Sequence, residues 1–150
     1  MGELIRDSKK KIRFDAIDIF WIIEHTIRNY KLSGHPKEFF HYIDELKTEW
    51  DLDIMNMIRH PLKALGVVDY VNFITCEEQY AHSIYKDNSL KFVWIDGDHG
   101  ADVVYNDLVN FWPKIKVGGT IGGDDIHYEE VLNDVKKFSK KYKVNVKYDY

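Results

Sequence analysis

Apolar and polar positions along the chain follow two patterns that alternate with each other. Four segments carry apolar residues at helical spacing, and short apolar runs typical of strands lie between them. The helical stripes cover residues 39–50, 54–65, 104–115 and 131–142, and the strand-like runs cover 11–18, 71–74, 91–96, 120–121 and 144–148. Strands that alternate with helices predict an α/β domain with a doubly wound, mostly parallel sheet.

Proline and glycine mark where these elements end. Pro61 lies inside the stripe at 54–65 and predicts a break or kink, and Gly66 is a candidate C-terminal cap for that helix. The Gly118-Gly119 pair predicts a tight turn before the short strand at 120–121. Residues 77–85 predict a short helix, whereas residues 19–37 give no clear assignment.

The most informative chemistry follows two of the predicted strands. Asp96, Asp98 and His99 follow the strand at 91–96, and Asp124 and Asp125 follow the strand at 120–121. A helix lies between these strands, so both strands should run parallel and end at the same edge of the sheet. Ligands bind at this edge in open α/β folds. The four carboxylates are therefore expected to converge, with a cation, a proton or a polar ligand relieving their repulsion.

Length, charge and cysteine content narrow the class of protein. The 150 residues predict one domain, residues 1–150. A net charge of -4 gives no reason to expect a nucleic-acid partner. No apolar run is long enough for a membrane span, and the polar start lacks a signal peptide. The single cysteine, Cys76, fits a reducing compartment, so we expect a cytoplasmic protein.

Each candidate residue also has a purely structural interpretation. Asp124 or Asp125 would cap the helix that follows, and Asp98 would start a turn. His99 and His127 would be surface or core histidines without a metal. Asp18 would end a strand in a plain turn, and Cys76 would be a small buried apolar residue.

Three stretches of this sequence resemble a known family. Phe-Val-Trp-Ile-Asp-Gly-Asp-His at 92–99, the segment 106–119 ending in Lys-Val-Gly-Gly, and Gly-Asp-Asp at 123–125 resemble the C-terminal half of class I S-adenosylmethionine (SAM) methyltransferases. The closest type is the small-molecule O-methyltransferase group that includes macrocin-type sugar methyltransferases. Residues 11–18 are similar to the second strand of that group, and residues 62–75 are similar to its third strand and the preceding helix.

The resemblance implies a role for each candidate. Asp18 would hold the ribose hydroxyls of SAM, Cys76 would lie at the adenine pocket, and Asp96 would lie beside the cofactor. Asp96, Asp124 and Asp125 would bind a divalent ion such as Mg²⁺, which prefers carboxylate oxygens. Asp98 would accept the proton of the substrate hydroxyl as that oxygen attacks the methyl group.

One part of the family pattern has no counterpart. The first strand and its Gly-rich loop should precede residue 10, but Gly2 is the only glycine before Gly34. We therefore expect an N-terminally truncated SAM-methyltransferase fold with a gap in its sheet. The strand at 91–96 would pair directly beside the strand at 11–18, or a partner chain would fill the gap in a homo-oligomer. The apolar run 19–23 is a candidate filler.

These observations predict SAM-dependent methyl transfer to a hydroxyl of a small-molecule acceptor, assisted by a divalent metal. A first alternative is a truncated, catalytically inactive methyltransferase-like domain that serves as a binding or assembly module. A second is a carboxylate-rich metal hydrolase, which would explain the aspartates but not the Lys-Val-Gly-Gly turn or the acid at the end of the strand at 11–18.

Overall fold

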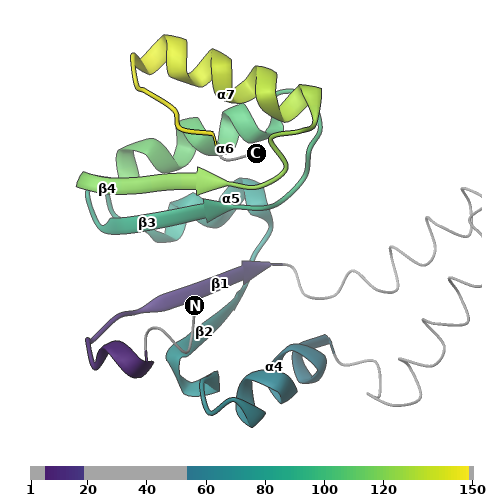
Figure 1. Cartoon of the computed structure of the whole chain (residues 1–150), viewed down its shortest axis with the longest axis vertical. Helices are drawn as coiled ribbons and strands as arrows, with labels where there is room; N and C mark the ends of the chain where they lie inside the picture. Colours follow the sequence, from purple (N-terminus) through teal and green to yellow (C-terminus); the bar gives the residue numbers. More distant parts are fainter. Residues whose placement is uncertain (1–5, 19–53, 149–150) are drawn as a thin grey trace, which may run out of the picture. The chain divides into compact units, whose positions relative to one another are not determined.

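The computed structural model describes residues 6–18 and 54–148. The chain divides into two compact units, Met1–Cys76 and Glu77–Tyr150 (Figure 1). The helix predicted at 39–50 and the apolar run at 19–23 lie outside the described residues.

The first unit is built on two parallel strands. Strand β1 (Phe14–Asp18) pairs with β2 (Val71–Thr75) in register, from Phe14 opposite Val71 to Asp18 opposite Thr75. Helix α4 (Ile54–Ala64) and the 3-10 turn η1 (Val68–Tyr70) lead into β2. The strands predicted at 11–18 and 71–74 are thus confirmed, with β1 starting later than predicted.

Of Pro61 and Gly66, only Gly66 marks the C-terminal end of α4. The helix does not break at Pro61, which lies inside it. It ends at Ala64, and Gly66, two residues further on, has a φ of +67° that suits glycine. The Gly66 amide donates to the Lys63 carbonyl and the Val67 amide donates to the Leu62 carbonyl, both at 2.9 Å. This paired arrangement is a Schellman motif, so the predicted cap is confirmed.

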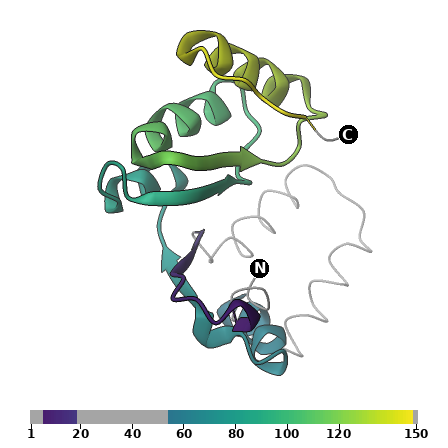
Figure 2. The same cartoon turned by 60° about the vertical axis from the view of Figure 1, so that its left-hand side comes forward.

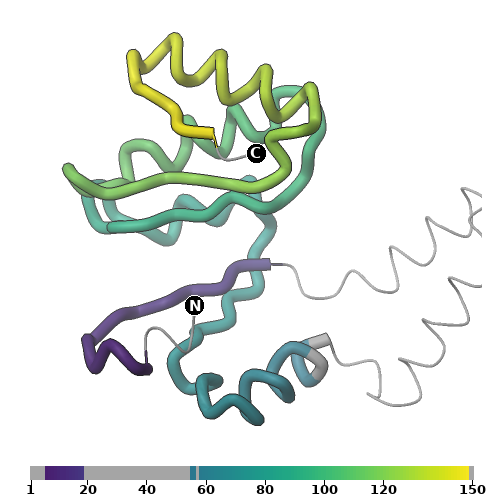
Figure 3. Tube along the Cα trace, viewed as in Figure 1, coloured from purple at the N-terminus to yellow at the C-terminus, as the bar shows by residue number. Residues whose placement is uncertain are grey.

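The second unit is also built on two parallel strands (Figure 2). Its elements are α5 (Glu78–Ala81), η2 (His82–Ile84), β3 (Leu90–Ile95), α6 (Val103–Phe111), η3 (Trp112–Lys114), β4 (Ile115–Gly123) and α7 (Glu129–Tyr142). The trace in Figure 3 follows β3 into α6, back through β4 and on into α7. The short helix predicted at 77–85 and the βαβ unit with parallel strands are both confirmed.

The core of the second unit lies between the sheet and the two longer helices. Val93 and Ile95 of β3 are buried, whereas Phe92 and Trp94, at the alternate positions, are exposed. Helix α6 packs against both β3 and α7. The buried apolar side chains of α6 and its neighbours are Val104, Leu108, Phe111, Ile115, Val131 and Phe138. The helical stripes at 104–111 and 131–142 therefore do form the core.

Strand β4 differs from the sequence prediction. The predicted helix at 104–115 ends at Phe111, and Ile115 is instead the first, buried residue of β4. The predicted tight turn at Gly118-Gly119 is a bulge inside the strand, since the register with β3 shifts there. A Cβ at Gly119 would lie 2.9 Å from the Lys116 carbonyl oxygen and 3.0 Å from the Lys91 carbonyl oxygen, so this bulge brings backbone too close for a side chain.

The predicted strand at 144–148 is wrong, because these residues form no ladder with the described strands. Helix α7 ends at Tyr142, and the next residue, Lys143, caps it with a φ of +54° before the chain folds back on the helix end. The Ser139 hydroxyl donates to the Val144 carbonyl oxygen at 2.6 Å. The alternating apolar residues indicate that one side of this segment is shielded from solvent. Such shielding does not require pairing with another strand.

The architecture is thus α/β with parallel strands, as predicted. Within residues 6–18 and 54–148 the strands form two two-stranded sheets, β1-β2 and β3-β4. Their joining into one doubly wound sheet, the truncation, and the pairing of residues 91–96 beside 11–18 stay predictions. Over the same residues, no helix combines the length and apolar character that crossing a membrane would need.

Candidate functional site

The carboxyl ends of β3 and β4 meet at one edge of the sheet. Ile95 lies opposite Gly123 in the ladder, and the Asp124 amide donates to the Ile95 carbonyl at 3.3 Å. A Cβ at Gly123 would lie 2.6 Å from that same carbonyl oxygen, so glycine permits the close approach. Asp96 and Asp124 therefore begin two loops that start side by side, as the βαβ pattern predicted.

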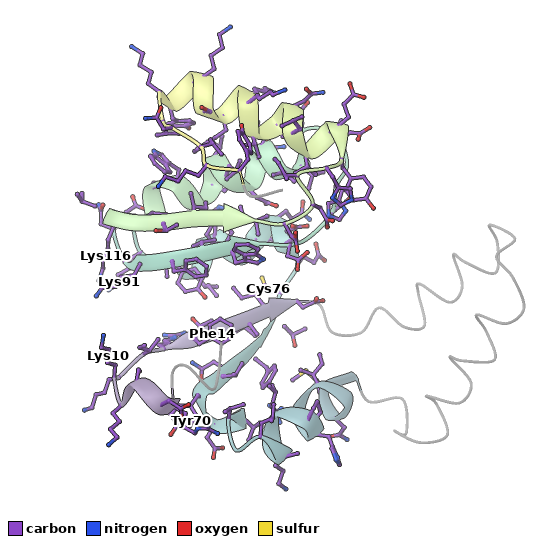
Figure 4. All side chains as sticks on the ribbon, viewed as in Figure 1. Lys10, Phe14, Tyr70, Cys76, Lys91 and Lys116 are labelled. Atoms are coloured by element: carbon purple, nitrogen blue, oxygen red, sulfur yellow. The ribbon has the colours of Figure 1, made fainter. Side chains whose placement is uncertain are left out.

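The other end of this sheet carries positive charge. Lys91 and Lys116, both exposed, lie near the starts of β3 and β4 (Figure 4). The aspartates lie at the opposite, carboxyl ends of the same two strands. The sheet thus has a basic end and an acidic end, and a cationic group such as a sulfonium is favoured at the acidic one.

Asp98 is held in a tight turn after β3. Its carboxylate oxygen Oδ1 accepts a hydrogen bond from the Gly100 amide at 2.9 Å. Its own amide donates to Glu78 Oε2 of α5 at 3.4 Å. A Cβ at Gly97 would overlap the Glu78 carboxylate, so this turn packs directly onto α5. The turn-forming role of Asp98 is confirmed, and its role as a base stays a prediction.

Asp125 lies between two histidines in the loop after β4. Its Oδ2 lies 2.7 Å from His99 Nε2, and its Oδ1 lies 3.7 Å from His127 Nδ1. The Tyr128 ring contacts both imidazoles, with centroids 5.1 Å and 4.3 Å away. The Asp125 backbone has φ of +59°, and its amide donates to Asp124 Oδ1 at 2.8 Å. The loops after β3 and β4 are therefore joined through His99 and Asp125.

The capping interpretation of the two aspartates is wrong. The N-cap residue of α7 is Tyr128, and no side chain caps the helix. Asp125 contributes only its carbonyl oxygen, which accepts from the Tyr128 amide at 3.0 Å in the preceding turn. The carboxylates of Asp124 and Asp125 are thus not engaged at the end of α7.

The predicted metal ligands do not form a ready-made cage. In the described part of the chain, no group of three or more histidine, cysteine, aspartate or glutamate side chains is arranged to hold a metal ion. Asp96, Asp124 and Asp125 share the sheet edge, but the Asp125 carboxylate turns to His99. A hard cation needs several oxygens converging on one point. The three carboxylates are not gathered around one point, and their role as metal ligands stays a prediction.

Asp18 and Cys76 lie together in the first unit. Asp18 is the exposed last residue of β1, and Cys76 directly follows β2 (Figure 4). The Cys76 amide donates to the Asp18 carbonyl at 3.1 Å. Cys76 is half-buried rather than fully buried. The roles of Asp18 and Cys76 in binding SAM stay predictions.

Sequence reasoning missed a buried carboxyl on α6. Asp107 of α6 is 4% exposed, and its Oδ2 meets no hydrogen-bond partner among the described residues. Burial, and next the side chain and charge of Glu78, raise the pKa of Asp107 to about 7. An aspartate inside an apolar helical stripe was the available signal, since such residues are rarely buried unpaired.

Comparison with known proteins agrees with this geometry. The chain matches a family described as a methyltransferase domain over residues 17–126. Neither a curated protein nor a solved structure matches the chain. The matched region contains Asp18, Cys76 and the loops after β3 and β4, and it covers more than half of the sequence. This protein therefore belongs to the methyltransferase domain family, whose members have a Rossmann-like α/β fold and depend on SAM.

Proposed function

We propose that this protein transfers the methyl group of SAM to a hydroxyl of a small molecule. Membership of the family supports methyl transfer in general. The hydroxyl acceptor rests on one observation, the contact of His99 with Asp125 next to Asp98 at the acidic sheet edge. A hydroxyl must lose its proton as its oxygen attacks the methyl group, so a base at this edge serves that reaction.

Each unit carries residues that we assign to cofactor binding. Asp18 would accept hydrogen bonds from the two ribose hydroxyls, and Cys76 would contact the adenine ring. Asp96 would lie near the positive sulfonium, where a carboxylate favours the charged donor over the neutral product. When bound, SAM supplies an electrophilic methyl group. The chain's task is then to hold the acceptor oxygen in line with the methyl carbon and sulfur.

Two residues are candidates for the base. Asp98 is fixed in its turn by Gly100 and Glu78. His99 is the second candidate, because the Asp125 carboxylate at its Nε2 fixes the ring and leaves Nδ1 as the atom that can accept a proton. We favour Asp98 as the base, with His99 and Asp125 aligning the acceptor.

A divalent ion at Asp96, Asp124 and Asp125 is a separate proposal. Three carboxylates on neighbouring loops offer the oxygen ligands that Mg²⁺ prefers. Since these side chains are not gathered around a point, none of the steps above depends on the ion. Metal assistance would appear as tighter binding of a hydroxylated acceptor in the presence of Mg²⁺.

Calorimetric titration of S-adenosylhomocysteine tests the proposed function. We expect micromolar binding to the full chain, with weaker binding to Asp18→Asn. Asp87→Asn is the matched control, since it removes an exposed carboxylate that pairs with Lys114. Titrations with and without Mg²⁺ test the ion. Absence of binding in both conditions would contradict the proposal and favour a non-catalytic binding module. Light scattering of the same sample tests the predicted homo-oligomer.

A further inference from the structure

The first turn of α6 is capped by a side chain from another helix. Asp102, the N-cap residue of α6, gives the helix no side-chain cap and pairs with Lys137 of α7 instead. The Tyr105 amide in this turn donates to Asp134 Oδ2 of α7 at 3.0 Å. Amides in the first turn of a helix have no partner within the helix, so Asp134 supplies the acceptor that the N-cap residue does not.

The same turn of α6 ends the loop that carries the candidate base. The Gly100 amide donates to Asp98 Oδ1 at 2.9 Å, and the Gly100 carbonyl accepts from the Val103 amide at 3.1 Å. Val103 is the first residue of α6. A Cβ at Gly100 would lie 3.3 Å from a Val103 methyl carbon and 3.5 Å from Asp98 Oδ1, so the loop packs closely on the helix. Two hydrogen bonds thus join the Asp98 carboxylate to the first turn of α6.

We propose that Asp134 and Lys137 of α7 are positioning residues that hold the Asp98 loop by anchoring the first turn of α6. Asp134 acts through the Tyr105 amide, and Lys137 acts through Asp102 at the end of the loop. Both lie beyond residues 17–126, so the family match assigns them no role. The anchor stands on these contacts, whereas its importance for catalysis rests on the proposed function, in which Asp98 is the base.

Burial makes Asp134 more than a surface contact. The residue is only 5% exposed. A buried carboxylate needs hydrogen-bond donors in place of water, and an amide at the N-terminus of a helix is a favourable donor because the helix dipole is positive there. Lys137 meets the same turn, since its Nζ lies 4.0 Å from the centroid of the Tyr105 ring. Two side chains of α7 therefore converge on one turn of α6.

Apolar packing holds α7 against α6 independently of this anchor (Figure 1). Val131 and Phe138 of α7 are each 3% exposed. The Phe138 ring also meets the Trp112 ring edge-on, with centroids 5.4 Å apart. Burial of these side chains should keep the helices together when one polar contact is removed. Loss of the Asp134 carboxylate is therefore expected to release the first turn of α6 and the Asp98 loop rather than unfold the unit.

Amide hydrogen exchange of the full chain, followed by nuclear magnetic resonance, tests the anchor without any ligand. The probe is the Gly100 amide, because its protection reports the bond to Asp98 Oδ1. Asp134→Ala removes the acceptor, and we expect it to accelerate Gly100 exchange about tenfold or more. Asp134→Asn keeps a side-chain oxygen for the Tyr105 amide, so it should retain most of the wild-type protection.

Ser139→Ala is the matched control within α7. Its hydroxyl donates to the Val144 carbonyl at 2.6 Å, near the C-terminal end of the helix. This variant loses one half-buried hydrogen bond without touching the first turn of α6, so Gly100 exchange should stay as in the wild type. A general loss of stability in α7 would instead accelerate Gly100 exchange in both Ser139→Ala and Asp134→Ala.

Four results would overturn the proposal. They are free exchange of the Gly100 amide in the wild type, unchanged exchange in Asp134→Ala, equal acceleration in Asp134→Asn, and equal acceleration in Ser139→Ala. If Asp134→Ala does not fold, Lys137→Met carries the test, because Lys137 is exposed and its replacement releases Asp102. Unchanged Gly100 exchange in that variant would then overturn the proposal.

Activity separates this anchor from the proposed function. Asp134→Ala should lower kcat for methyl transfer about 10- to 100-fold, because the base is displaced from its aligned position. Affinity for S-adenosylhomocysteine should stay within about threefold, and Asp134→Asn should restore kcat. Faster Gly100 exchange with unchanged kcat would support the anchor and contradict the role of Asp98 as base. The exchange experiment involves neither SAM nor an acceptor, so its failure is distinct from failure of the proposed methyl transfer.

Discussion

His99 Nε2 lies 2.7 Å from Asp125 Oδ2, and this contact joins the loop after β3 to the loop after β4. The two strands already meet through the bond from the Asp124 amide to the Ile95 carbonyl. The contact between the His99 and Asp125 side chains joins the two loops beyond the sheet, at the edge where Asp96 and Asp98 lie. It fixes the orientation of an imidazole beside the candidate base, which is a requirement for aligning an acceptor.

Replacement of Asp98 tests which residue removes the acceptor proton. Asp98→Asn should lower kcat about 10²- to 10⁴-fold, the contribution of a general base, because an amide cannot accept a proton. The bond from Gly100 to the side-chain oxygen can persist in this variant. The measurement is methyl transfer from SAM to an acceptor found in a screen of hydroxylated small molecules. Affinity for S-adenosylhomocysteine should stay within about threefold.

His99→Gln is the companion variant to Asp98→Asn. We expect it to raise KM for the acceptor more than it lowers kcat, because His99 and Asp125 are assigned to alignment. A pattern in which His99→Gln abolishes turnover and Asp98→Asn does not would transfer the role of base to His99.

The pH dependence of stability follows from Asp107. Its pKa is raised from the ordinary aspartate value of 3.8, which holds in the unfolded chain, to about 7 in the folded one. The folded state therefore binds an extra proton between these two values. The stabilising contribution of this group to the free energy of unfolding is fully present below pH 3.8 and falls as the pH rises toward about 7. Urea unfolding at several pH values measures this contribution.

The control for that measurement is Asp107→Asn, which should flatten the fall and be more stable than the wild type at about pH 8. Equal slopes for the two proteins over the same range would contradict the assignment to Asp107. Asp87→Asn should keep the wild-type slope, because its carboxylate is exposed and pairs with Lys114.

Gly97→Ala should displace Glu78. An added methyl group would overlap the Glu78 carboxylate, which lies at the end of a flexible side chain and can swing aside. The chain should then remain folded but lose the bond from the Asp98 amide, at a cost of about 0.5–1.5 kcal/mol. Urea unfolding and the amide shift of Asp98 measure the two effects.

Gly122→Ala is the matched control for Gly97→Ala, since its methyl group would contact the Trp94 ring rather than Glu78. It should leave the Asp98 amide shift unchanged. An unchanged shift in Gly97→Ala as well would mean that Glu78 does not hold the turn.

Gly66→Ala should destabilise the first unit. The φ of +67° at this position costs an L-residue about 1–2 kcal/mol. Gly66→Asn is the control, because asparagine tolerates left-handed backbone better and should cost less. Thermal unfolding of the full chain compares the two. An equal loss in both variants would show that the backbone conformation does not determine the effect.

The sequence by itself determined the local elements and the positions of the acids. The helical stripes at 104–115 and 131–142 and the apolar runs at 71–74 and 91–96 predicted the presence of their elements, because burial of one face selects the spacing of apolar residues, although α6 ends at Phe111. The βαβ order predicted that Asp96 and Asp124 lie at one edge of the sheet, because the two strands of such a unit run parallel and their carboxyl ends meet at the same edge.

Tertiary structure decided the remaining relationships, because they depend on contacts between distant residues. The pairing of Ile115 with Leu90 made it a strand residue although its spacing was helical. Residues 144–148 pair with none of the described strands although their pattern alternates. Asp125 turned toward His99 instead of capping α7. The contact of Glu78 with Gly97 and the Asp98 amide joins residues from two separate segments, and no pattern along the chain encodes such a contact.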